Sequence, residues 1–152
     1  MAYRTKRSAI APEACHLAHA IDLIGDRWSL LILRSALFGV RRFDDFQAEL
    51  DIPRTVLSGR LRRLVEGGLL EKSLYQETGK RRRTEYVLSL AGQALQPTLM
   101  ALTQWSDKWL LPDRPAPLSL RHRTTREEIE AGFLDPSGQR VHPDQIRIAY
   151  RR

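Results

Sequence analysis

The apolar residues between positions 54 and 66 constrain the fold more than any other part of this chain. They recur three or four positions apart, the spacing of one face of an α-helix: Leu57, Leu61, Leu64 and Val65. Phe43, Phe46 and Leu50 predict a shorter helix just upstream, and the link "DIP" between the two helices is short. Two helices joined by a link of a few residues, after a buried helix, form the outline of a helix-turn-helix unit.

Two more helices are predicted before this unit. The first stops at Gly25 and carries apolar residues at helical spacing: Leu17, Ala20, Ile21 and Ile24. Asp26 is placed to cap the second, which runs through "DRWSLLILRSALFG" and ends at Gly39. Because apolar residues occur on nearly every side of that segment, we expect it to be buried in the middle of a small domain.

A β-hairpin is predicted after the long helix, which Gly67 and Gly68 end. Apolar and polar residues alternate on both sides of the basic stretch "QETGKRRRTEY": Leu70 and Leu74 before it, and Tyr86, Leu88 and Leu90 after it. A hairpin with a long tip, directly after such a helix, has the position of the wing in a winged helix.

The chain then predicts a fifth helix and a small appendage. Ser89 is placed to cap one helix, whose apolar stripe is interrupted only by Pro97 near its start. Its apolar stripe needs a covering surface: Leu95, Leu99, Leu102, Trp105 and Trp109. Beyond Pro115 the chain is polar, and the turn signal "DPSG" between short alternating runs predicts a short β-hairpin.

The expected fold is therefore mainly α with a small β-hairpin. We expect an N-terminal arm over residues 1–14, a winged helix-turn-helix domain over 15–113 and a C-terminal extension over 114–152. A chain of 152 residues is long enough to bury a core without disulfides or a metal.

Charge and cysteine content narrow the function classes. The chain has 25 Lys and Arg against 18 Asp and Glu, and a net charge of +7 favours association with a polyanion. Cys15 is the only cysteine, so neither an intrachain disulfide nor a cysteine-rich zinc site forms within one copy, and a reducing, cytoplasmic compartment is expected. The longest apolar run, "LLIL", is far shorter than a membrane span of about 20 residues, and no signal peptide is visible. No metal or cofactor is expected.

The outward face of the helix over 54–66 has the chemistry of a surface that docks in a major groove. A turn of about 100° per residue puts Thr55, Gly59 and Arg62 opposite the apolar face, flanked by Ser58 and Arg63. Glycine in mid-helix costs about 1 kcal/mol relative to alanine. Gly59 either lets the backbone approach a groove wall or phosphate closely, or relieves a packing clash inside the domain.

The basic run at the hairpin tip comprises Lys80, Arg81, Arg82 and Arg83. A run of like charges by itself is most often a solvated loop. Beside a helix-turn-helix, however, the run is in position to contact the sugar-phosphate backbone or the minor groove, which would make binding strongly salt-dependent.

Three segments of the sequence, in this order, resemble motifs of the HxlR family of bacterial winged-helix regulators, relatives of the MarR group. The segments are "CHLAHAIDLIGDRWSLLILRSALFGVRRFDDFQAEL", "IPRTVLSGRLRRLVEGGLLEK" and "EYVLSLAG", within about residues 15–111. The resemblance implies a homodimer on palindromic operator DNA, with a recognition helix over 53–66 and a wing over 70–88. This wing tip is about two residues longer and far more basic than the family's usual tip, and Pro53 replaces a serine-like cap.

The resemblance also assigns roles to residues. The first and last helices of the domain would make the dimer contact, through Leu17, Leu99, Leu102, Trp105 and Trp109. Thr55, Ser58 and Arg62 would read bases, while Arg54, Arg63 and the wing cations would hold phosphates.

Cys15 is the candidate regulatory thiol. In several relatives a cysteine at this position senses oxidants or electrophiles, and here it lies near the predicted start of a helix, with His16 and His19 close in sequence. With one thiol per chain, oxidation would yield an intersubunit disulfide, a mixed disulfide or a sulfenic acid. The alternative is a buried, inert cysteine that packs in the first helix.

We expect no enzymatic activity. The sequence has no G-x-S-x-G, phosphate loop or H-E-x-x-H motif. Its histidines fall in two distant groups without acidic partners at ligand spacing: His16, His19, His122 and His142. The working interpretation is a homodimeric transcriptional repressor whose DNA affinity changes with modification of Cys15 or with a small ligand held between the domain and its dimerisation helices. The alternative is a winged-helix adaptor that binds protein or RNA.

Overall fold

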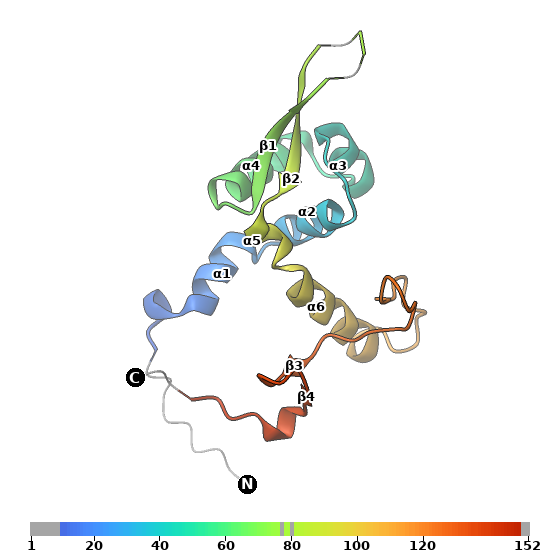
Figure 1. Ribbon diagram of the computed structural model, residues 1–152. Coiled ribbons are helices and arrows are strands. Elements are labelled where there is room, and N and C mark those ends of the chain that lie inside the picture. The colour runs from blue at the N-terminus through green and yellow to red at the C-terminus, as the bar shows by residue number, and fades with distance from the viewer. Residues whose placement is uncertain (1–9, 77, 80, 150–152) are drawn as a thin grey trace. The chain divides into compact units, whose positions relative to one another are not determined.

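The computed structural model describes residues 10–76, 78, 79 and 81–149 of the chain (Figure 1). The chain divides into two compact units, 1–94 and 95–152, which are described separately below. The first unit contains four helices of two or more turns and one hairpin, in the order expected of a winged helix-turn-helix. The predicted fold class is confirmed.

The elements of the first unit follow the predicted order closely. They are the 3-10 turn η1 (Pro12–Ala14), α1 (His16–Ile24), α2 (Arg27–Leu37), α3 (Phe43–Leu50), α4 (Arg54–Glu66), β1 (Leu70–Tyr75), β2 (Arg83–Leu88) and the short α5 (Leu90–Gln93). Asp26 caps α2 as predicted, because its carboxylate accepts hydrogen bonds from the backbone N–H groups of Trp28 and Ser29, each at 3.1 Å.

The core of this unit lies where α2, α3 and α4 meet the base of the hairpin. Its fully buried apolar side chains come from all of these elements: Ile32, Leu33, Phe46, Ile52, Leu57, Leu61, Leu64 and Leu70. The apolar face predicted for α4 is thus confirmed at three of its four positions, while Val65 is half-buried.

The prediction that α2 is buried on nearly every side is wrong. Leu30 and Leu31 are half-buried and Phe38, just after the helix, is exposed, whereas the buried side contains Ser29 and Ser35. The Ser29 hydroxyl donates to the Asp26 carboxylate and the Ser35 hydroxyl to the Glu49 carboxylate at 2.6 Å, so both polar groups are satisfied at little cost.

The turn between α3 and α4 depends on one residue with left-handed backbone. Asp51 ends α3 with φ 48° and ψ 39°. Aspartate is one of the few non-glycine residues that adopt this conformation readily. The chain can therefore turn within residues 51–53 and start α4 at once.

The predicted hairpin is confirmed as an antiparallel pair, from Leu70 opposite Leu88 to Tyr75 opposite Arg83. Its strands project away from the helices of this unit (Figure 1). The segment before α3 adds to the same sheet, because the Tyr86 N–H donates to the Arg41 carbonyl at 2.8 Å and Arg42 forms a bridge with Glu85. The wing is thus attached to the start of α3 as well as to the end of α4.

The prediction of one continuous fifth helix is wrong. Ser89 caps only the short α5, accepting from the Gly92 N–H at 3.0 Å, and a separate helix α6 spans Gln96–Trp109. Pro97 has no N–H to donate to the carbonyl of Gln93 four residues earlier, so the hydrogen-bond ladder breaks there. Proline is tolerated in the first turn of α6 for the same reason.

The second unit consists of α6, the predicted small hairpin and a final turn. Strands β3 (Phe133–Leu134) and β4 (Arg140–Val141) pair antiparallel, and the 3-10 turn η2 spans Pro143–Gln145. The side-chain amide of Gln104 joins α6 to the extension: its Nε2 donates to the Ile129 carbonyl at 3.1 Å, and its Oε1 accepts from the Ala131 N–H at 2.9 Å. Across the described parts of the chain, no helix combines the length and apolar character needed to cross a membrane.

Candidate nucleic-acid interface

The outward face of α4 forms a shallow hollow open to solvent. It is lined by five of the six residues predicted for the recognition helix: Arg54, Thr55, Ser58, Gly59 and Arg62. All except the half-buried Gly59 are exposed. Helical periodicity is the reason that they gather, because residues three and four positions apart lie on one face. The hollow combines two guanidinium groups and two hydroxyl groups around a residue without a side chain.

Gly59 lines this hollow and faces open space. A Cβ atom built on Gly59 meets no heavy atom within 4 Å. The alternative that this glycine relieves a packing clash within the domain is therefore wrong, because alanine would fit without contact. The backbone of α4 is accessible there to a partner that approaches closely.

Arg54 is oriented along the start of α3. Its guanidinium carbon lies 4.8 Å from the centroid of the Phe43 ring, and its Nη1 lies 3.7 Å from the Asp44 carboxylate. Both charged side chains remain about 70% exposed, so the ion pair holds Arg54 only weakly. An anion in the hollow can compete for this guanidinium.

Arg63 lies away from the hollow, although it was predicted beside the recognition face. Its Nη2 donates to the Asp22 backbone carbonyl at the end of α1. The side chain thus attaches α4 to α1. A helical-wheel argument could not reveal this, because the position is exposed and the acceptor belongs to another helix.

The basic residues of the wing are at its solvent-exposed end. Arg81, Arg82 and Arg83 are exposed, and Lys80 lies outside the described residues. Arg83 begins β2 opposite Tyr75, so its backbone is fixed by the sheet. Arg81 and Arg82 precede the paired region.

A second hollow lies between the start of α3 and the outer end of the paired wing strands, and sequence reasoning missed it. Its lining includes Arg42, Arg54, Tyr75 and Arg83. The Arg42 guanidinium carbon lies 4.4 Å from the centroid of the Tyr75 ring, a distance at which a cation is attracted to the ring face. Arg54 and Arg83 were predicted as DNA contacts, whereas Arg42 and Tyr75 were not. Arg54 lines both hollows, and the second hollow combines its three arginines with the carboxylates of Asp44 and Asp45.

Cys15 lies at the junction between η1 and α1 and is half-buried. Its N–H donates to the Pro12 carbonyl at 3.1 Å, and its carbonyl accepts from the His19 N–H at 3.2 Å. The His19 ring is used separately, since its Nε2 lies 2.9 Å from the Glu13 carbonyl. The thiol is therefore at a helix start, as predicted, and is partly accessible.

The residues predicted for a dimer contact include several exposed apolar side chains. On α1, Leu17 is 67% exposed, and on α6 Leu102, Trp105 and Trp109 are 50%, 50% and 65% exposed. Leu99 differs, since it is buried within the chain. Each unit thus carries apolar surface that its own residues leave uncovered.

The short turn between α3 and α4, the exposed polar face of α4 and the hairpin after it define a winged helix-turn-helix protein. The model of the HxlR-like helix-turn-helix family matches residues 23–114, and the chain belongs to this family.

Known proteins agree with that assignment. The HTH-type transcriptional regulator Rv3095 of Mycobacterium tuberculosis is 44% identical over 118 residues, which cover 78% of this chain and 73% of the relative. The crystal structure of PA1607, a proposed transcription factor, is similar with a TM-score of 0.76 at 30% identity and covers 91% of this chain and 96% of that one. The reduced form of the transcriptional regulator YodB from Bacillus subtilis is similar with a TM-score of 0.56 at 28% identity and covers 64% and 96%. The chain is a transcriptional regulator with a helix-turn-helix domain.

Proposed function

We propose that this regulator binds one operator sequence in duplex DNA as a homodimer, with α4 in the major groove, and represses transcription. The observation that carries the proposal is the open surface at Gly59, in a hollow lined by Arg54, Thr55, Ser58 and Arg62. Glycine within a helix lowers stability, and packing inside the domain gives no reason for it. Close approach of the helix backbone to the wall of a DNA groove would give a reason for a glycine at position 59.

The chemistry of the hollow suits direct readout of bases. Arg62 is exposed and can donate two hydrogen bonds to one guanine, and the hydroxyl groups of Thr55 and Ser58 donate or accept. Arg54, at the first turn of α4, is expected to hold a phosphate, as are Arg81, Arg82 and Arg83 of the wing. Phosphate contacts fix the register of the helix, and base contacts select the sequence.

Homodimerisation is proposed from the uncovered apolar side chains. Indole and leucine side chains that stay half-exposed or more leave apolar surface in water, which a second copy would bury. The contact is expected to use Leu17 of α1 and Leu102, Trp105 and Trp109 of α6. A two-fold dimer would read two half-sites, so the operator is expected to be palindromic.

Regulation through the thiol of Cys15 is the proposed switch. The side chain is partly accessible, and the reduced YodB structure belongs to a relative that has also been solved after treatment with diamide. Two Cys15 thiols, one from each subunit, would lose two hydrogens to one diamide molecule and form one disulfide bond. The changed distance between the two α1 helices would alter operator affinity.

The test is selection of bound sequences from a random duplex library, first with reduced protein and then after diamide treatment. A palindromic motif that is lost on oxidation would support both the dimeric regulator and the Cys15 switch. A motif that is indifferent to oxidation would refute the thiol switch and keep the regulator. Absence of any motif, with binding to RNA or protein instead, would overturn the proposed function in favour of an adaptor.

A further inference from the structure

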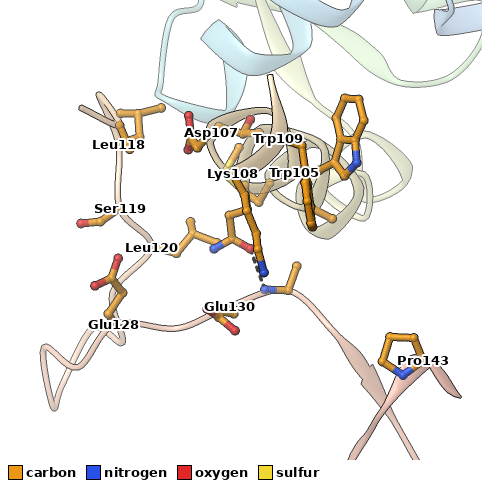
Figure 2. Close-up of a pocket in the computed structure, with 16 residues that line it drawn as sticks. Trp105, Asp107, Lys108, Trp109, Leu118, Ser119, Leu120, Glu128, Glu130 and Pro143 are labelled. Carbon is orange, nitrogen blue, oxygen red and sulfur yellow. Dashed lines mark hydrogen bonds between the residues drawn. The ribbon is translucent and has the colours of Figure 1, made fainter. Parts of the chain in front are cut away.

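The second unit contains a pocket that the proposed function does not use. It lies between α6 and the C-terminal extension, with a volume of about 680 Å³, within the range of about 300 to 1,000 Å³ usual for small-molecule sites. Figure 2 shows α6 on one side and the segments that carry Leu118 to Leu120 and Glu128 to Glu130 on the other. Gln104 holds the segment that carries Glu128 to Glu130 to the helix through two backbone hydrogen bonds, and the Ile129 N–H donates to the Leu120 carbonyl of the other segment at 2.9 Å.

Aromatic surface forms part of the pocket wall. Trp105 and Trp109 line it, and their side chains are 50% and 65% exposed. Indole rings at this exposure offer π-faces on which a flat ring can stack. Lys108 lies with its ammonium nitrogen 5.3 Å from the centroid of the Trp109 ring. At this distance the π-face of Trp109 attracts the ammonium group, so the ring can interact with a positive charge.

Acidic groups dominate the charges of the lining. Asp107, Glu128 and Glu130 contribute three carboxylates against the single ammonium of Lys108. Glu130 is paired with Arg140 at 2.9 Å, whereas no ion pair or side-chain hydrogen bond within the described ranges involves the carboxylates of Asp107 or Glu128. In a chain with a net charge of +7, this pocket is a local acidic site.

We propose that this pocket binds a planar aromatic molecule that carries a positive charge, and that its occupancy changes DNA affinity. The ring stacks on the indoles, and the charge is placed against Glu128 and the π-faces. An anionic ring of the same size meets the carboxylates of Asp107 and Glu128 and is rejected.

Coupling between pocket occupancy and DNA binding rests on the proposed function, and it follows from where the side chains lie around α6. At about 100° per residue, Gln104 and Lys108 lie at the centre of the pocket side, and Leu99 and Leu102 lie on the opposite side. Trp105 and Trp109 stand at the border, so the same indoles belong to the pocket and to the proposed dimer contact. A ligand that fixes their rotamers changes the surface offered to the second copy.

Calorimetric titration of the full chain, without DNA, tests the binding site directly. The probe is N-methylquinolinium, and naphthalene-2-carboxylate is the anionic ring of matched size. Saturable binding of the cation alone is expected, and Glu128→Gln is expected to weaken it by about threefold to tenfold. Glu127→Gln removes a neighbouring carboxylate that does not line the pocket, and it should leave the affinity unchanged. The proposed site would be refuted by equal binding of the anion, by an unchanged affinity of Glu128→Gln for the cation, or by the absence of saturable heat.

A second measurement separates the coupling from the site. DNA affinity is measured at fixed salt with and without the cation, for the native chain and for Glu128→Gln, which controls for any action of the cation on DNA itself. A change in the native chain alone supports the coupling. Equal DNA affinities with a bound cation refute the coupling and leave the site intact. Failure to bind any DNA sequence refutes the proposed function, while the calorimetric result stands by itself.

Discussion

Nε of Arg60, in the middle of α4, lies 2.9 Å from Oδ1 of Asp26, the residue that caps α2. The contact is an ion pair without a hydrogen bond, because the N–H of Nε does not point at an acceptor. Both side chains are about one-third exposed. Asp26 thereby holds the start of α2 through its cap hydrogen bonds and α4 through its charge.

Acid should weaken the fold through Asp26. Burial alone would raise the pKa of this carboxyl, but hydrogen bonds from Ser29, the charge of Arg60 and the Trp28 N–H outweigh it and lower the pKa below the ordinary 3.8. A carboxyl with a lowered folded pKa stabilises the fold fully above the unfolded value, and this contribution is lost as pH falls through the folded pKa. Asp26→Asn keeps a capping side chain, so it should cost only about 1 kcal/mol at pH 7.

Urea unfolding at pH 7 and at several values below pH 4 measures this difference. The native chain and Asp26→Asn should converge in stability in acid. Asp26→Ala, which also loses the cap, should stay about 1 kcal/mol less stable than Asp26→Asn. A constant difference between native and Asp26→Asn at all pH values would contradict the role of the charge.

Gly59→Ala should stabilise the free protein and weaken its complex with DNA. The added methyl group enters open space, so unfolding should require about 0.5 to 1 kcal/mol more. The same methyl group would stand between α4 and the groove, and affinity should fall by about threefold to tenfold. Chemical denaturation and fluorescence anisotropy measure the two effects.

Gly92→Ala is the matched control in another helix. There an added Cβ would collide with the Leu69 carbonyl, so destabilisation is expected. Gain of stability at position 59 without loss of DNA affinity would show that the helix backbone does not approach the groove.

Arg62→Ala should lower affinity for the selected operator by about 1 to 3 kcal/mol and relax specificity at one position of each half-site. The reason is the loss of paired hydrogen bonds from an exposed guanidinium that lines the hollow. Competition binding with operator and random duplexes measures both effects. An equal loss of affinity for random DNA would contradict a base-reading role of Arg62.

Replacement of Arg81, Arg82 and Arg83 together by alanine should weaken binding to all DNA. The slope of log affinity against log salt should become shallower by about 2 to 3, because about 0.9 is lost for each phosphate contact. Alanine at Arg114, Arg123 and Arg147, three exposed residues of the second unit, removes the same charge elsewhere. A slope that changes equally in both triple variants would mean that the wing acts only through net charge.

Cys15→Ser should make operator affinity insensitive to diamide. Serine keeps the size of the side chain but forms no disulfide, and Cys15 is the chain's only thiol. Binding titrations before and after diamide, together with non-reducing electrophoresis, check the result. A covalent dimer is expected in the native chain alone, and loss of DNA affinity on oxidation of Cys15→Ser would exclude the thiol as the sensor.

Local features made most of the fold predictable from the sequence. The apolar spacing of α4 and the cap at Asp26 each report on a few neighbouring residues, and both were confirmed. The alternation on both sides of the wing tip predicted the paired strands correctly, but Leu74 is exposed and Leu90 begins α5 instead of extending β2. The break at Pro97 was visible as a residue, but its effect was underestimated, because a helix tolerates proline only in its first turn.

Contacts between distant residues were not predictable in the same way. The hydrogen bond of Arg63 to Asp22 and the ion pair of Arg60 with Asp26 depend on how α4 packs against its neighbours, and periodicity alone does not distinguish one arginine of the helix from another. The pairing of Arg42 with the Tyr75 ring likewise requires the register between the wing and the start of α3. The Gln104 amide could not be distinguished from any other polar helix residue until its two backbone partners were known.

The left-handed residue Asp51 has a consequence for how such a regulator can diversify. The turn that aims α4 depends on a backbone conformation at Asp51 that glycine, asparagine and aspartate adopt readily, while β-branched side chains resist it. Thr55, Ser58 and Arg62 lie outside that turn and outside the core. In the proposed complex, exchange of these three exposed residues would change which operator is read and leave the scaffold unaltered. A β-branched residue at position 51 would instead disturb the orientation of α4 and with it every such readout.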